Sequence, residues 1–188
     1  MPSSGSHPLI TAQYDAARVQ LGNSDALILL RVDEEQTAIA VGRGATPDAT
    51  LTLAIGTQKT AKAHFKHTPP SPLELEKAIA TVEDEVTRAK TLMPTGARLV
   101  TTDRSLRDIA LLSGLPSAPA MRLPLDTMER TFDRMVQRSL GYPASFDRLP
   151  AGNDFAARLL ILREFMHHLQ FADITLLQVD HQYINIDS

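Results

Sequence analysis

Three strand-like segments with very short connections constrain this chain more than any other feature. They are "DALILLRV" (25–32), "QTAIAVGR" (36–43) and "ATLTLAIG" (49–56), each apolar or alternating in the way that strands are. The first connection is the acidic tip 33–35, and the second is "GATPD" (44–48), which is rich in turn-forming residues. Parallel strands need a long crossover, so connections this short predict an antiparallel meander.

The strongest helix signal follows the meander, in "SPLELEKAIATVEDEVTRAKTLMP" (71–94). Ser71 has the residue type of an N-cap, Pro72 that of a first helical position, and Glu74 completes a capping box. Apolar residues then recur every three or four positions, which predicts a helix with one buried face.

The rest of the chain gives the order βββ-α-β-α-α-α-β, with no internal repeat. We expect a strand at 97–103, helices at 105–114, 126–143 and 153–171, and a last strand at 173–179. The Pro-rich stretch 115–125 is expected to connect two helices, and 9–23 is left open between a short helix and irregular structure. We therefore predict an α/β fold with a five-stranded mixed sheet, residues 25–188 as a single domain, and residues 1–24 as a partly disordered lead.

Composition excludes several classes of function. The 188 residues carry a formal net charge of −3, which argues against a nucleic-acid partner. The absence of cysteine excludes disulfides and thiolate metal sites. No signal-peptide pattern and no long apolar run is present, so a cytoplasmic protein with no membrane partner is expected.

Three segments together resemble the second domain of the exopolyphosphatase and guanosine pentaphosphate phosphohydrolase (Ppx/GppA) family. They are "LTLAIGTQKTAKAHFKHTPPSPLELEKAI" (51–79), "ARLVTTDRSLRDIALLSG" (97–114) and "LPAGNDFAARLLILREFMHHLQFADITLL" (149–177). The likeness covers roughly residues 25 to 180 in the correct order. It implies the ribonuclease-H-like half of an actin-like ATPase fold.

The two phosphate-loop positions of that family are changed here. Its Asp-Ile-Gly-Gly-Gly-Ser-Thr hairpin corresponds to "RVDEEQT", so the candidate ligand-binding positions are Arg31, Asp33, Glu34, Glu35 and Thr37. Its Gly-Gly-Thr loop corresponds to "TDRS", which adds Thr102, Asp103, Arg104 and Ser105. Glycines let backbone N–H groups approach a phosphate, whereas carboxylates repel it. The family's first domain and its catalytic Glu motif have no counterpart, so no catalytic residue is assigned.

Two functional hypotheses follow from this resemblance. The first is a non-catalytic exopolyphosphatase-like domain that acts as a protein-interaction or regulatory module, with a homo-oligomer or a partner protein and no cofactor. The alternative is a phosphohydrolase of polyphosphate or guanosine polyphosphate, which would need Mg²⁺ or another divalent metal, or a separate partner domain.

Other polar clusters have ordinary structural explanations. The pairs His64/His67 and His167/His168 have the residue type for a metal site, but adjacent helical residues point about 100° apart and loop histidines are commonly exposed. The acids at 83–85 fan around a helix, and those at 33–35 suit an exposed hairpin tip, with cation binding as the alternative. Asp103 or Ser105 could simply cap the following helix. We therefore predict no metal site.

Overall fold

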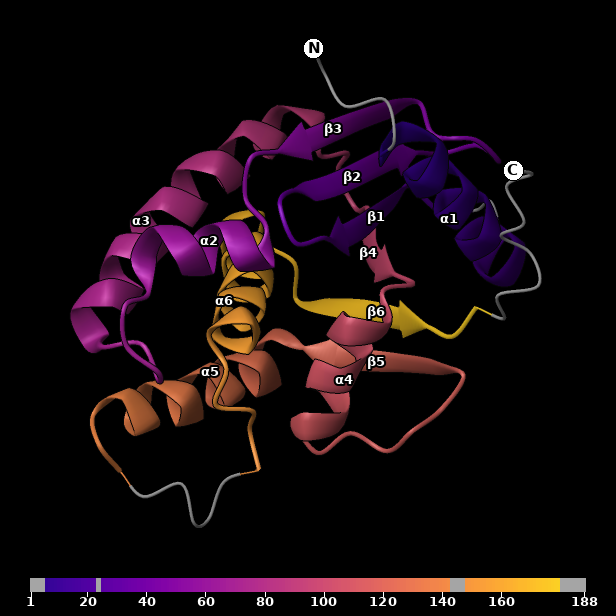
Figure 1. Ribbon diagram of the computed structural model, residues 1–188. Helices are drawn as coiled ribbons and strands as arrows, with labels where there is room; N and C mark the ends of the chain where they lie inside the picture. The colour runs from indigo at the N-terminus through magenta and orange to yellow at the C-terminus, as the bar shows by residue number, and fades with distance from the viewer. Residues whose placement is uncertain (1–5, 23–24, 143–147, 180–188) are drawn as a thin grey trace, which may run out of the picture.

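A mixed six-stranded sheet with helices on both faces makes up the molecule (Figure 1). The computed structural model describes residues 6–22, 25–142 and 148–179. The strands are β1 (Leu27–Val32), β2 (Thr37–Gly42), β3 (Ala49–Leu53), β4 (Arg98–Thr101), β5 (Ala120–Pro124) and β6 (Asp173–Leu177). The helices are α1 (Ser6–Leu21), α2 (Thr57–His64), α3 (Pro72–Thr87), the 3-10 helix η1 (Arg88–Leu92), α4 (Arg104–Leu112), α5 (Leu125–Ser139) and α6 (Asn153–His168).

The predicted meander is present at one side of the sheet. The strand order is β3-β2-β1-β4-β6-β5, with β1 antiparallel to β2 and β2 antiparallel to β3. β4 lies parallel to both β1 and β6. β5 is the outermost strand on the other side of the sheet and runs antiparallel to β6. The carboxyl ends of β1, β4 and β6 therefore lie at the same edge of the sheet.

The prediction of five strands is wrong, because residues 120–124 form the edge strand β5. Met121 and Leu123 point into the core, while Ala120 and Arg122 face solvent. Prolines on both sides of this segment suggested a connector. An edge strand tolerates proline because one side of its backbone needs no ladder partner.

Unequal numbers of helices cover the two faces of the sheet. Ile28, Leu30 and Val32 of β1 face the larger core, which includes residues of α2 to α6. Leu27 and Leu29 of the same strand face a smaller core beneath α1. Burial on both faces explains why β1 reads as a continuous apolar run in the sequence.

The capping residues that the sequence suggested are found at the starts of α3 and α4, although α4 begins one residue earlier than expected. At α3 the capping box is confirmed, because Ser71 accepts from the Glu74 N–H and the Glu74 side chain accepts from the Ser71 N–H. At α4 the cap is Asp103, whose side chain accepts from the Ser105 N–H. This is one of the two capping residues that the sequence suggested.

Helix α1 covers one face of the sheet, where the sequence had left helix and irregular structure open. Ile10, Tyr14 and Ala17 are buried against the sheet. The Arg18 guanidinium, on a residue only 4% exposed, donates to the Tyr14 hydroxyl and to the carbonyl groups of Gly22, Asp25 and Gly42. These bonds attach α1 to the sheet. Within the described residues, no helix is both long and apolar enough to cross a bilayer.

Candidate functional site

The candidate site lies at the sheet edge where β1 and β4 end. These strands are neighbours and run in the same direction, so the turns after them meet. The Asp103 Oδ2 atom, after β4, lies 3.3 Å from the Val32 backbone nitrogen at the end of β1. The structure therefore brings the two predicted loops together, at the kind of edge where open α/β sheets bind ligands.

The turn after β4 is organised around the Asp103 carboxylate. Its Oδ1 atom accepts from the Ser105 backbone N–H at 2.9 Å and from the Ser105 hydroxyl at 2.7 Å. The Asp103 N–H donates to the Thr101 hydroxyl at 3.0 Å. A helix N-terminus ordinarily attracts anions. At α4 a side-chain anion of the protein itself occupies that place.

The turn after β1 lies against the N-terminus of α2. The Asp33 carbonyl accepts from the Thr57 N–H at 2.9 Å, and the Glu34 carbonyl accepts from Gln58 at 2.9 Å and Lys59 at 3.0 Å. The hairpin backbone therefore satisfies three N–H groups that a helix start normally leaves open. This second helix N-terminus is also occupied.

Gly56 makes the contact between the hairpin and α2 sterically possible. A Cβ atom built on it would lie 2.4 Å from the Gln36 backbone nitrogen and 2.5 Å from the Glu34 carbonyl oxygen. Those atoms belong to the backbone and have no rotamer to relieve the clash. Only glycine fits at this position, and the sequence showed Gly56 merely as the end of a strand-like segment.

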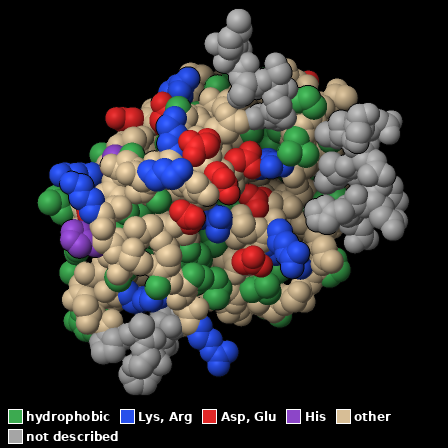
Figure 2. Space-filling model, viewed as in Figure 1, with side chains coloured by type: hydrophobic (Ala, Val, Ile, Leu, Met, Phe, Trp, Pro, Cys, Tyr) green, Lys and Arg blue, Asp and Glu red, His purple; other side chains and the backbone are tan. Residues whose placement is uncertain are grey.

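The acidic side chains of the hairpin tip face solvent or pair with neighbouring cations. Arg31 Nε lies 2.6 Å from Asp33 Oδ1. Glu34 and Glu35 are exposed, and Glu35 lies 3.7 Å from Lys62 Nζ. The view in Figure 2 shows acidic and basic side chains mixed over the centre of this face. The tip therefore presents no concentrated positive charge to a phosphate chain.

The remaining predicted positions do not form a common site. The Thr37 hydroxyl is buried and donates to the Ile55 carbonyl at 2.8 Å, so it joins the start of β2 to the segment that follows β3. The Thr102 hydroxyl is shielded from solvent and has no hydrogen-bond partner among the described residues. Arg104 is exposed at the first turn of α4. These three side chains have three different environments.

The described carboxylates and imidazoles do not gather into a metal site. Among the described residues, no three His, Asp or Glu side chains are placed to hold an ion. His67 Nδ1 lies 2.9 Å from Glu74 Oε1, and His168 Nε2 lies 2.9 Å from Glu164 Oε2. Each of these imidazoles thus has a carboxylate partner. The geometry of the described residues therefore offers no set of three protein ligands for Mg²⁺.

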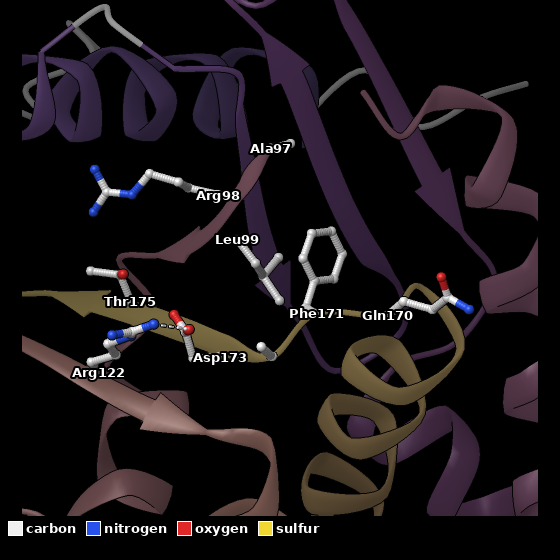
Figure 3. A pocket seen from close by; sticks show the side chains of 9 residues that line it. Ala97, Arg98, Leu99, Arg122, Gln170, Phe171, Asp173 and Thr175 are labelled. Atoms are coloured by element: carbon white, nitrogen blue, oxygen red, sulfur yellow. Dashed lines mark hydrogen bonds and ion pairs between the residues drawn. The ribbon is translucent and has the colours of Figure 1, made fainter. Parts of the chain in front are cut away.

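A hollow at the opposite edge of the sheet was missed by sequence reasoning (Figure 3). It measures about 470 Å³ and lies where β4 and β6 separate before their paired residues, beside Leu99 and Phe171. Arg122 and Asp173 pair across its rim at 2.5 Å, and the Arg98 side chain points away from Phe171. No predicted site residue lines it. Nothing in the sequence signalled it, because it arises from the divergence of two strands.

The arrangement of these elements is the fold of a Ppx/GppA exopolyphosphatase domain, which confirms the α/β class expected from the resemblance. The chain superposes over 89% of its length on the Aquifex aeolicus Ppx/GppA phosphatase, with a TM-score of 0.74 and 15% identity. An exopolyphosphatase-like protein matches 90% of the chain with a TM-score of 0.67 and 11% identity. An exopolyphosphatase from Cytophaga hutchinsonii matches 92% with a TM-score of 0.63 and 11% identity.

At these identities the likeness shows the fold alone. The chain spans 58%, 63% and 61% of the lengths of these three proteins, which is less than two thirds in each case. No protein-family profile matches the sequence. No curated protein matches it either.

Proposed function

We propose that this chain is a non-catalytic exopolyphosphatase-like domain that works as a protein-interaction or regulatory module. One observation carries the proposal. At the sheet edge where β1 and β4 end, oxygen atoms of the protein already accept from three backbone N–H groups at the start of α2, those of residues 57–59, and from the Ser105 N–H at the start of α4. A phosphate chain would have to displace these oxygens in order to use the same donors.

Charge adds a second obstacle to phosphate binding. Glu34 and Glu35 stand at the hairpin tip, and the Asp103 carboxylate lies in the neighbouring turn. Two like charges about 4 Å apart repel by about 1 kcal/mol in water and by about 4 kcal/mol near a protein surface. The acids therefore disfavour a polyanion that approaches from solvent.

The partner of such a module is a second copy of the chain or another protein, in the cytoplasm. Sedimentation over a range of protein concentrations tests the homo-oligomer. A strict monomer at high concentration would restrict the proposal to a different partner.

Phosphate release is the decisive measurement for the catalytic question. The chain is incubated with Mg²⁺ or Mn²⁺ and with ATP, GTP or polyphosphate, beside an active exopolyphosphatase as a positive control. We expect no release and no thermal stabilisation by any of these compounds. Turnover by the chain alone would overturn the proposal in favour of the phosphohydrolase.

A charge-neutral variant separates the two obstacles. Glu34→Gln combined with Glu35→Gln removes two acids while leaving the backbone bonds of the hairpin in place. We expect this variant to remain inactive and unable to bind polyphosphate, because the N–H donors are still engaged. Binding that appears on neutralisation alone would contradict the role given to the engaged donors.

A further inference from the structure

A groove beside α1 contains a carboxylate oxygen that has no hydrogen-bond partner among the described residues. It measures about 450 Å³, and its described lining includes Ala12, Asp15, Ala16 and Val19 of the helix together with Val179 after β6. The four helix residues have the spacing of one helical face. Val19 is 87% exposed, which is unusual for a large apolar side chain beside a groove.

Asp15 is the only acidic residue among the described residues that line this groove. Its Oδ1 atom is shielded from solvent and has no hydrogen-bond partner within the part of the chain that the structure describes. Burial raises the pKa of Asp15 above its usual range. A carboxylate oxygen that has lost water without gaining a donor favours the approach of a cation to that carboxylate.

Arg18 is the described cation on the same helix, and it does not pair with Asp15. Arg18, one turn further along α1, directs its guanidinium to Tyr14 and to backbone carbonyls on the sheet side. Charge complementarity to Asp15 therefore points to another molecule.

We propose that this groove binds a segment of a partner protein that places one lysine or arginine beside Asp15 and apolar side chains against Ala12, Ala16 and Val19. The inference rests on the proposed function, since it names a surface through which an interaction module would act. The small side chains of Ala12 and Ala16 let a partner backbone approach closely, and Val19 supplies apolar area. Asp15 selects for positive charge.

Two helical probe peptides test the charge requirement on the full-length chain. One carries a lysine one turn from a leucine, and the other has norleucine in place of the lysine. Amide chemical shifts of the isotope-labelled chain report where each peptide binds, and titration gives its affinity. We expect the lysine peptide to shift signals of α1 and Val179 and to bind about tenfold more tightly than the norleucine peptide.

Three variants complete the design, each checked first for a cooperative thermal transition. Asp15→Asn should lower the affinity for the lysine peptide to that for the norleucine peptide. Val19→Ser should weaken both peptides alike, and Asp84→Asn, an exposed acid on α3, should change neither. Equal binding of the two peptides to the parent chain would overturn the proposal, as would Asp15→Asn with unchanged affinity or shifts confined to other elements.

A small amine distinguishes a protein partner from a metabolite. If n-hexylammonium binds in an Asp15-dependent manner while the lysine peptide does not, the groove is a small-molecule site and the protein partner is wrong. The phosphate-release assay is independent of these titrations. Failure of the peptides with no phosphate release overturns the groove alone, whereas phosphate release overturns the proposed function.

Discussion

The Asp103 carboxylate lies 3.3 Å from the Val32 backbone nitrogen, so a side chain that begins α4 also holds the end of β1. The same carboxylate accepts from the Ser105 N–H and hydroxyl. One acid thereby joins a strand end, a turn and a helix start. In a phosphate-binding edge these donors would face a ligand, whereas here they stabilise the fold.

Asp103→Ala should destabilise the chain by about 1 to 2 kcal/mol, because α4 loses its cap and β1 loses a hydrogen bond. Urea unfolding measures the change. Asp103→Asn is the matched control, since an amide oxygen also caps a helix, and it should retain most of the stability. Equal losses in the two variants would contradict the capping role.

Gly56→Ala should cost about 1 to 3 kcal/mol, because the new Cβ would overlap the hairpin backbone that lies on α2. Gly44→Ala is the matched control. A Cβ atom on Gly44 meets only the Thr46 carbonyl, at an ordinary 3.9 Å. Denaturant unfolding should give a clearly lower midpoint for Gly56→Ala than for Gly44→Ala. Similar midpoints would show that the hairpin backbone shifts at little cost to make room for the new Cβ.

Gln170→Gly should stabilise the chain by about 0.5 to 1 kcal/mol. Gln170 has a φ of 61° after the end of α6. Its N–H donates to the His167 carbonyl, and the Phe171 N–H donates to the Met166 carbonyl. This is the Schellman arrangement, in which glycine avoids the steric cost of the left-handed conformation. Thermal unfolding should show Gln170→Val less stable than the parent, and the reverse order would contradict the assignment.

Glu74→Gln should remove a pH-dependent part of the stability. The Ser71 N–H, then the Lys66 N–H and the His67 imidazole, lower the pKa of Glu74 from 4.5 to about 2. Because the folded-state pKa is the lower one, the contribution is present above about pH 4.5 and is lost as the pH falls towards 2. Melting temperatures of the parent and of Glu74→Gln should therefore converge at low pH, while Glu76→Gln, on the exposed face of α3, should follow the parent throughout.

Asp15→Asn should have the opposite pH dependence. Burial raises the pKa of Asp15 above 3.8, so its protonated form suits the folded state and its charged form does not. The penalty is absent below the ordinary pKa and grows as the pH rises through the folded-state value. Thermal scans should show Asp15→Asn equal to the parent in acid and more stable near neutrality; a less stable variant at pH 7 would mean that the carboxylate has a stabilising partner.

The sequence predicted those elements that are bounded by recognisable capping or turn residues. The capping box at Ser71 and Glu74 located α3, and the short turns located the meander. β5 was missed because its prolines resemble a connector, although Met121 and Leu123 alternate as strand residues do. α2 was absent from the predicted order, and its N-cap Gly56 makes no side-chain cap bond.

The sequence predicted which two turns form the candidate site, but it did not predict the contacts within it. The sequence located both turns and included Asp103 as a cap, which the structure confirms. The carbonyl groups of Asp33 and Glu34 that bind α2 are backbone atoms, so residue types give no sign of them. The groove at Asp15 depends on how α1 lies beside the end of β6, which is a tertiary relationship with no local signature.

Arg18 has a consequence for the pairing of β1 with β2. Its guanidinium holds the Asp25 and Gly42 carbonyls, next to the Leu27–Gly42 pair at the open end of that hairpin. A slip by one residue would move one carbonyl away from the guanidinium and turn Leu27 and Leu29 towards the opposite face. The acidic turn closes one end of the hairpin, and a helix from outside the meander sets its strand register at the other.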